Sequence, residues 1–225
     1  MKNIAIIPAR GGSKRLPNKN ILLLGGIPLI AHSILFAKKN KEYIDEVYVS
    51  TDNAAIKEIA LYFGAKVIDR PGSISGDLEP TVSALKHSLW IINDAEIENI
   101  IVLQVTNPLR PENILTEAFE ILKKENYDSL FTVSRNNEKL GKIINKQFIP
   151  FNYEMGQRSQ DLEPLYYENG LLYISKAKLI LDNKIVDAAA FPMLLNHIFA
   201  TVDIDMQDDF EYAEYLYQKH ITPNS

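Results

Sequence analysis

Short apolar runs alternate along this chain with stretches in which apolar residues recur at helical spacing. The runs suited to buried strands cover residues 4–7, 47–50, 66–68, 100–104 and 129–134. Between them, residues 56–63 show the i, i+3, i+4, i+7 spacing of one helix face, and residues 81–93 and 112–124 also read as helices. Strands that alternate with helices predict an α/β fold, a three-layer sandwich around a mostly parallel, mixed sheet.

This alternation stops between residues 135 and 168. The segment is polar and aromatic, and its apolar residues Phe148, Phe151 and Tyr153 have no helical or strand face of their own. It is either a long surface excursion or an arm that pairs with a second subunit, because long loops in compact domains usually have a function. We expect one domain over residues 1–225, with this excursion ordered mainly by a partner chain.

Regular patterning resumes with strands at residues 171–174 and 198–204 and a helix from about Asp208. Asp203 and Asp205 stand two apart in the second strand, so both side chains would point to the same face. Two carboxylates on one face repel unless a cation lies between them, and hard oxygen ligands favour Mg²⁺. Helix N-capping is the alternative reading, and it suits Asp208 better than two residues inside an apolar pattern.

The loop after the first predicted strand is rich in glycine and positive charge. The first 41 residues contain eight Lys or Arg and no Asp or Glu, and four of these cations fall in residues 8–20 with Gly11, Gly12 and Ser13. Glycines let backbone N–H groups approach a ligand closely, and nearby cations attract negative charge. The loop therefore suits a polyphosphate, and a solvated basic turn is the alternative.

A second polar cluster, residues 104–110, directly follows a buried strand. In open α/β sheets, ligands bind beyond the carboxyl ends of strands, which makes Gln104 a candidate ligand contact. A glutamine in this place can equally cap a loop. The sequence contains neither G-x-x-x-x-G-K-[ST] nor G-x-G-x-x-G, and its four histidines show no metal-ligand spacing.

Composition narrows the class of protein. The 225 residues are 46% hydrophobic and carry a formal charge of −5, which argues against a dedicated nucleic-acid or anionic-membrane binder. The chain has no cysteine, so disulfides and thiolate chemistry are excluded. The apolar stretch at residues 21–36 is broken by two glycines, a proline and a histidine, and the first apolar run is short for a secretory signal. We expect a cytoplasmic protein without a membrane span.

The clusters together resemble the acylneuraminate cytidylyltransferase family. The opening motif I-I-P-A-R-x-G-S-K-x-L-P-x-K-N occupies residues 6–20, and further motifs follow in the family's order over nearly the whole chain. The later motifs are Ser50-Thr51-Asp52, Arg70-Pro71, Gln104 with Pro108-Leu109-Arg110, Glu168-Asn169-Gly170 and Asp203-x-Asp205. The resemblance implies a nucleotidyltransferase-like fold in which the anomeric hydroxyl of a 3-deoxy-2-ulosonic acid attacks the α-phosphorus of CTP and expels pyrophosphate. Such a step depends mostly on positioning and charge neutralisation.

The resemblance also implies roles for single residues. The expected contacts to the triphosphate and to cytidine are Arg10, Gly11, Gly12, Ser13, Lys19, Asn20, Arg70 and Thr81. Gln104 corresponds to a sugar-acid contact, and Asp203 and Asp205 correspond to ligands of Mg²⁺ or another divalent cation. The residues expected to take part in catalysis are Arg10, Lys19, Asp203 and Asp205. In the family the excursion builds a homodimer and lends residues to the neighbouring sugar site, so Lys142 and Arg158 are candidates for the ulosonate carboxylate.

Three departures from the family's pattern leave the sugar open. Arg15 stands where many sialate enzymes have glycine, Val105 where proline is common, and Asn107 where serine is frequent. The acid could be N-acetylneuraminate, its deaminated form, or an acid of the legionaminate or pseudaminate type. The alternatives to this function are a nucleotidyltransferase acting on a sugar phosphate or alcohol phosphate, a non-catalytic nucleotide-binding protein, and a phosphatase with an Asp-x-Asp nucleophile.

Overall fold

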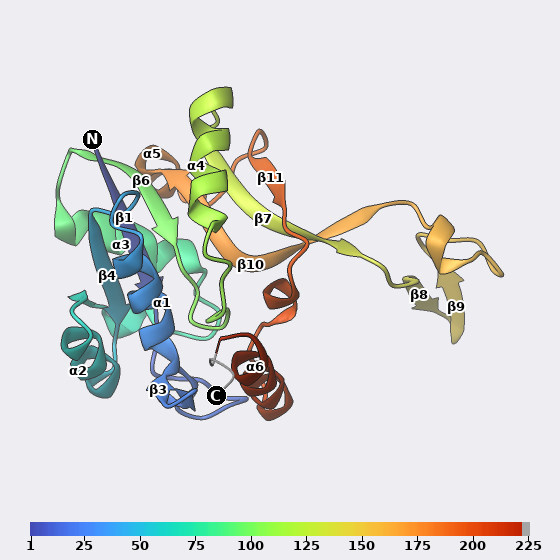
Figure 1. Ribbon diagram of the computed structural model, residues 1–225, viewed down its shortest axis with the longest axis horizontal. Helices are drawn as coiled ribbons and strands as arrows, with labels where there is room; N and C mark the ends of the chain where they lie inside the picture. Colours follow the sequence, from blue (N-terminus) through green and yellow to red (C-terminus); the bar gives the residue numbers. More distant parts are fainter. Residues whose placement is uncertain (222–225) are drawn as a thin grey trace.

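A seven-stranded sheet forms the centre of the molecule in the computed structural model, which describes residues 1–221 (Figure 1). Its strands in chain order are β1 (Lys2–Pro8), β4 (Glu46–Thr51), β5 (Lys66–Asp69), β6 (Ile97–Val102), β7 (Ser129–Asn136), β10 (Leu165–Lys176) and β11 (Phe191–Leu194). They lie in the order β11-β7-β10-β6-β1-β4-β5, and every adjacent pair is parallel except the two that involve β10. The predicted mostly parallel, mixed sheet is confirmed.

Helices cover both faces of this sheet, as predicted. One face packs against α1 (Leu29–Lys39), α2 (Ala54–Tyr62) and α4 (Ile114–Glu125), and the other against α3 (Thr81–Ile92) and α5 (Ala177–Leu181). The central strand β1 shows why its sequence is an unbroken apolar run: Ala5 and Ile7 face the first set of helices, and Ile4 and Ile6 face the second. All four side chains are almost fully buried.

The last helix, α6 (Gln207–His220), packs on a short hairpin made of β2 (Leu23–Leu24) and β3 (Ile27–Pro28). Gly25 turns this hairpin with a φ of 58°, and the ring of Tyr217 lies where a Cβ at that position would be. A larger residue there would therefore be strained and would also displace α6. The helix expected from about Asp208 begins one residue earlier.

Residues 137–164 form an arm that projects from the body between β7 and β10 (Figure 1). The arm contains a hairpin of β8 (Gly141–Ile144) and β9 (Gln147–Pro150), turned by Asn145 and Lys146, which both have positive φ. The expectation that Phe148 has no strand face was wrong, because Phe148 lies in β9. Phe151 and Tyr153 follow the hairpin outside any strand, as expected.

A strand over residues 198–204 was also expected, and this is wrong. Ile198–Thr201 is a 3₁₀ helix, and the residues after it run without strand pairing along the carboxyl edge of the sheet. The apolar alternation that suggested a strand is real, since Val202 and Ile204 are buried. They are buried by packing into the core from a loop, which requires no ladder of hydrogen bonds.

In the described chain, no helix is both long enough and apolar enough to cross a membrane.

Candidate active site

The opening loop leaves the carboxyl end of β1 and is held by the neighbouring strand β4. The N–H of Ala9 donates to the carbonyl of Ser50 at 2.9 Å, and the N–H of Gly11 donates to the carboxylate of Asp52, also at 2.9 Å. A Cβ at Gly11 would lie 2.7 Å from the side-chain nitrogen of Asn53, so the close approach requires glycine. The Ser50-Thr51-Asp52 motif therefore shapes the opening loop.

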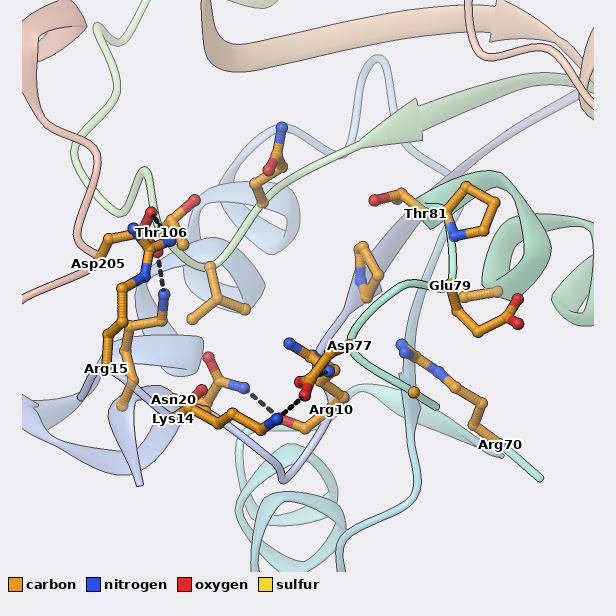
Figure 2. Close-up of a pocket in the computed structure, with 18 of the residues that line it drawn as sticks. Arg10, Lys14, Arg15, Asn20, Arg70, Asp77, Glu79, Thr81, Thr106 and Asp205 are labelled. Carbon is orange, nitrogen blue, oxygen red and sulfur yellow. Dashed lines mark hydrogen bonds and ion pairs between the residues drawn. The ribbon is translucent and has the colours of Figure 1, made fainter. Parts of the chain in front are cut away.

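This loop forms one side of a cleft of about 460 Å³ at the carboxyl edge of the sheet (Figure 2). The other sides are the segment between β5 and α3, the loop after β6, and Asp205. The cleft is lined by eight of the predicted site residues, which are Arg10, Ser13, Lys19, Asn20, Arg70, Thr81, Gln104 and Asp205. Segments far apart in the sequence thus converge where ligands bind in open α/β sheets.

The other predicted site residues lie outside this cleft. Gly11 lines a small adjacent recess, and a Cβ at Gly12 would meet no atom within 4 Å. Lys142 and Arg158 are on the arm, where Lys142 lies over the ring of Phe151 and Arg158 is paired with Asp161. Within one chain, the arm does not bring these two cations to the cleft.

Lys19 and Asp205 form the most buried charge pair in the cleft. Lys19 is 9% exposed, and its ammonium group donates to the carbonyl of Ile204 at 2.7 Å and to Asp205 at 2.9 Å. Arg15 donates to the other carboxylate oxygen of Asp205 at 2.5 Å. Although burial opposes it, these hydrogen bonds and charges hold the pKa of Asp205 below its ordinary value. Asp205 is therefore an anion at neutral pH.

Asp203 stands in the loop before Asp205 and is not among the residues that line the cleft. The N–H of Ile204 donates to the carbonyl of Thr106 at 2.9 Å, and the amide of Asn107 donates to the carbonyl of Val202 at 2.7 Å. These two bonds fasten the Asp-x-Asp segment to the loop after β6. Close packing around the carboxyl group raises the pKa of Asp203, with Asp205 adding repulsion and a hydrogen bond from Thr106 opposing the rise.

The guanidinium of Arg70 is buried at the side of the cleft opposite Asp205 (Figure 2). It donates to the hydroxyl of Ser50 at 3.1 Å and to the carbonyl of Ser50 at 2.6 Å. Burial lowers the pKa of Arg70, and the charge of Arg10 adds to this while Asp52 opposes it. Both bonds hold the planar donor group in a fixed orientation, which suits recognition of a planar ligand edge.

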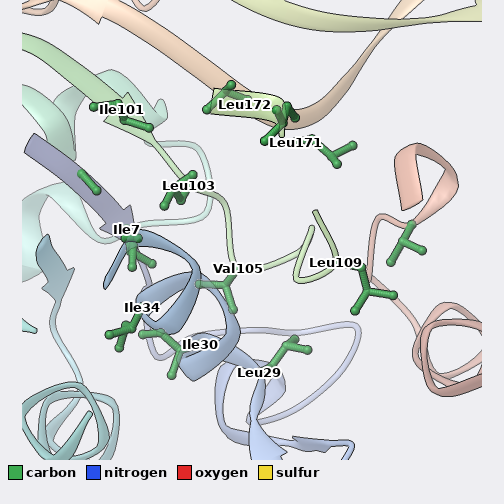
Figure 3. Packing of buried hydrophobic residues seen from close by; sticks show 14 of the residues in the cluster. Ile7, Leu29, Ile30, Ile34, Ile101, Leu103, Val105, Leu109, Leu171 and Leu172 are labelled. Carbon is green, nitrogen blue, oxygen red and sulfur yellow. The ribbon is translucent and has the colours of Figure 1, made fainter. Parts of the chain in front are cut away.

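Gln104 is placed between two anchored neighbours. Leu103 and Val105 are buried in the core beside Ile30 and Ile34 of α1 (Figure 3). The backbone carbonyl of Gln104 accepts a hydrogen bond from Arg110 at 2.8 Å. The backbone is thus fixed on both sides while the Gln104 side chain lines the cleft.

The family motif assigns no role to Arg110, but its hydrogen bonds indicate a structural one. The side chain is buried and also donates to the carbonyl of Leu171 at 2.9 Å and to the hydroxyl of Ser33 at 3.0 Å. Burial lowers the pKa of Arg110 to about 9, which leaves it charged at neutral pH. It therefore connects α1, the loop after β6 and β10 beneath the cleft.

Sequence reasoning missed Asp77. This residue lines the cleft and stands in the segment between β5 and α3. Its carboxylate pairs with Arg10 at 2.6 Å and with Lys14 (Figure 2). Hydrogen bonds from Lys14 and Arg10 hold the pKa of Asp77 below its ordinary value. No periodicity or motif marks this residue, because it stands in an irregular loop.

Carboxylates for a metal ion are few in the cleft. Among residues 1–221, no group of three or more His, Asp or Glu side chains is arranged to hold a metal ion. Mg²⁺ commonly uses one or two carboxylates together with substrate phosphates, so Asp203 and Asp205 suit that type of site in their chemistry. Both oxygens of Asp205 are paired with cations, which a metal ion would have to displace.

This chain is similar to known proteins over nearly its whole length. A family model described as cytidylyltransferase matches residues 4–225. The N-acylneuraminate cytidylyltransferase of Streptococcus agalactiae is 34% identical over 93% of this chain, and the chain spans about half (52%) of that relative's length. The pseudaminic acid cytidylyltransferase of Campylobacter jejuni is 33% identical and covered over 97% of both chains. The CMP-N,N'-diacetyllegionaminic acid synthase of Legionella pneumophila is 34% identical over 96% of both.

Among solved structures, a CMP:2-keto-3-deoxy-manno-octonic acid synthetase complexed with CTP superimposes with a TM-score of 0.71. It covers 97% of this chain and 99% of its own at 18% identity, which shows a shared fold. The family match extends over nearly the whole sequence, and several relatives exceed 30% identity over most of this chain. This chain therefore belongs to the cytidylyltransferase family.

Proposed function

We propose that this protein transfers CMP from CTP to the anomeric hydroxyl of a sialic-acid-like nonulosonic acid and releases pyrophosphate. The observation that carries the proposal is the cleft in which the opening loop, Arg70 and Gln104 converge. Two of the relatives are named for cytidylyl transfer to acids of this class, and a third is named for synthesis of the CMP derivative of such an acid. We further propose that residues 1–225 act as one nucleotidyltransferase domain in the cytoplasm, where CTP is available.

The nucleotide side of the reaction is assigned to the opening loop and Arg70. Arg10, Ser13 and Lys19 line the cleft with two cations and a hydroxyl, which suit the oxygens of a triphosphate. Asn20 and Thr81 lie beside them for the cytidine. The anomeric hydroxyl gives up its proton to water as its oxygen forms the bond to the α-phosphorus. The bond from that phosphorus to the bridging oxygen breaks, and the loop cations stabilise the charge on the departing pyrophosphate.

The sugar side is assigned to Gln104 and to the arm of a second subunit. Gln104 offers a hydrogen-bonding amide on the lining of the cleft. An acid also needs cations for its carboxylate, and those of the opening loop are assigned to the triphosphate. Lys142 and Arg158 on the projecting arm would supply them in a homodimer, with each arm reaching the partner's cleft.

A divalent cation, Mg²⁺ in the simplest case, completes the proposed site. Asp203 and Asp205 would hold it, and when bound it would supply charge neutralisation to the phosphates. Arg15 and Lys19, which pair with Asp205 in the free protein, would then be released to contact the triphosphate.

The deciding experiment measures pyrophosphate release with CTP and a panel of ulosonic acids. The panel should include N-acetylneuraminate, its deaminated form, legionaminate- and pseudaminate-type acids, and 3-deoxy-manno-octulosonate. UTP, ATP and GTP serve as nucleotide controls, and CTP without an acid shows the background rate. We expect release with CTP and at least one nine-carbon acid. Release that requires a sugar phosphate, or none with any acid, would contradict the proposal.

A further inference from the structure

Asp77 holds two cations of the opening loop in the way that a phosphate group would. One carboxylate oxygen lies 2.6 Å from Nη1 of Arg10, and the other pairs with the ammonium of Lys14. The Arg15–Lys19 half of the loop is paired with Asp205 in the same manner. All four cations of the loop are thus paired with only two carboxylates of the protein itself, so these six groups keep an excess of positive charge.

The segment that carries Asp77 has little else to hold it in place. Its other hydrogen bonds stay within residues 71–79. Leu78 is 98% exposed, and Gly72 has open space where a Cβ would be. The ion pairs with Arg10 and Lys14 are therefore the contacts that fix this segment across the cleft.

We propose that Asp77 occupies the place of a phosphate group in the free protein and sets the affinity of the cleft for its anionic ligand. The inference rests on the proposed function, because the ligand is the triphosphate of CTP or the pyrophosphate released from it. A ligand that uses Arg10 and Lys14 must first displace the carboxylate, and residues 72–79 move away with it. The return of Asp77 after the reaction favours release of pyrophosphate.

The test compares Asp77→Asn with a matched control, Asp128→Asn. Asp128 has nearly the same side-chain exposure (38% against 36%) and pairs with Lys178 at 2.6 Å, before the amino end of β7. Titration calorimetry would measure binding of inorganic pyrophosphate without added metal, of CTP, and of cytidine. Since two exposed ion pairs are removed, Asp77→Asn should bind pyrophosphate and CTP about three- to tenfold more tightly than the wild type. Cytidine binding, and all binding by Asp128→Asn, should be unchanged.

Hydrogen exchange provides the second measurement. Residues 72–79 should exchange faster in Asp77→Asn than in the wild type, and saturating pyrophosphate should produce the same change in the wild type. Pyrophosphate binding that is weaker or unchanged in Asp77→Asn would overturn the inference, because Asp77 would then support the bound state or contribute nothing. If the wild type binds CTP and Asp77→Asn binds it no more tightly, the role of Asp77 is overturned and the proposed function stands. If the wild type binds neither CTP nor pyrophosphate, both the role of Asp77 and the proposed function are overturned.

Discussion

The charged side chains of the cleft form ion pairs with one another, and an anionic ligand must break these pairs to bind. Asp205 accepts from Lys19 and Arg15, and Asp77 accepts from Arg10 and Lys14. Lys19 is the most buried of these cations, with a side chain 11% exposed, so its charge is the least screened by water. The effect of a substitution on turnover and on CTP binding should therefore increase with the burial of the charge pair that it removes.

Replacing Asp205 by asparagine should lower turnover by about 10²- to 10³-fold, the usual cost of removing one strong electrostatic group from an active site. The amide keeps the shape of the side chain but holds neither a divalent cation nor the charge of Lys19. Pyrophosphate release at saturating Mg²⁺ measures the loss, and circular dichroism checks that the fold is retained. Near-normal activity would show that Asp205 is not a metal ligand.

Lys19→Ala and Gln104→Ala should separate the two substrates. Lys19→Ala should weaken CTP binding whichever acid is used, because it removes a buried cation from the cleft. Gln104→Ala should leave CTP binding almost unchanged and lower kcat/KM for the acid a few- to tenfold. This loss corresponds to about 0.5–1.5 kcal/mol of transition-state stabilisation, the usual value of one hydrogen bond.

Calorimetry with CTP and kinetics with varied acid, measured on both variants, distinguish these outcomes. Thermal unfolding is the control for Lys19→Ala, since this side chain also donates to the carbonyl of Ile204. Loss of CTP binding in Gln104→Ala with normal acid dependence would place Gln104 on the nucleotide side.

At the scale of elements, buried polar side chains hold together the loops that carry the site. Asn107 donates to the carbonyls of Asn169 and Val202, and the side chain of Asn169 bonds to Thr132 and Ser134 of β7. Asn107 also lies against Gly170, where a Cβ would come within 2.8 Å of its oxygen. The Glu168-Asn169-Gly170 motif thus serves to position loops, because the buried polar atoms of Asn169 are satisfied by two separate segments, the loop after β6 and the strand β7.

Arg110→Met should lower the free energy of unfolding by about 2–4 kcal/mol, because three buried oxygens lose their donor while the side-chain volume is largely kept. Urea denaturation measures the change. Lys39→Met, which breaks an exposed pair with Glu112, is the control and should lie within about 0.5 kcal/mol of the wild type. If both variants unfolded at the same urea concentration, Arg110 would not be the connection that its contacts indicate.

His32 should make stability depend on pH where α6 meets the body. Its Nε2 bonds to the carbonyl of Leu24, and its ring packs edge-on against Tyr217. Burial lowers the pKa of His32 below 6.5, so the unfolded chain binds this proton more readily than the fold does. The free energy of unfolding should therefore fall as the pH drops through 6.5, and His32→Gln should have a shallower decline. Urea denaturation at a series of pH values measures this dependence. If the free energy of unfolding fell equally with pH in the wild type and in His32→Gln, His32 would not be the cause of the decline.

At the scale of the whole molecule, the arm leaves apolar surface uncovered. Ile143 is 79% exposed, Phe151 is 64% exposed and Met155 is 74% exposed, all on a segment that projects from the body (Figure 1). Exposed apolar surface of this extent is typical of an interaction site. A second copy of the chain is the partner that we propose.

Light scattering at micromolar concentration should report a dimer. The double substitution Ile143→Asp and Phe151→Asp should produce a monomer that binds CTP but has lost most activity with the acid, because Lys142 and Arg158 would no longer reach a partner's cleft. Tyr62→Asp, at a residue 85% exposed on α2, is the matched control and should remain dimeric. A wild-type monomer with full activity would contradict both the dimer and the contribution of the arm.

The alternation of strands and helices, the opening loop and the order of the motifs could all be predicted from the amino-acid sequence. These features are local: a buried strand such as β1 needs an apolar run, and a phosphate-binding loop needs glycine and cations within a few residues. The opening loop and Gln104 could be selected because each follows a strand, whereas the roles of Asn20, Arg70 and Thr81 came from the family resemblance alone. Their roles remain predictions for the experiments above.

Tertiary structure decided what depends on contacts between distant residues. Apolar alternation at residues 198–204 is satisfied by core packing from a loop as well as by a strand, so the pattern could not distinguish the two. Asp77 pairs with Arg10 across 67 positions, and Arg110 reaches Leu171 across 61. No local pattern contains such a pairing, because it exists only after the sheet has brought the carboxyl ends of its strands together.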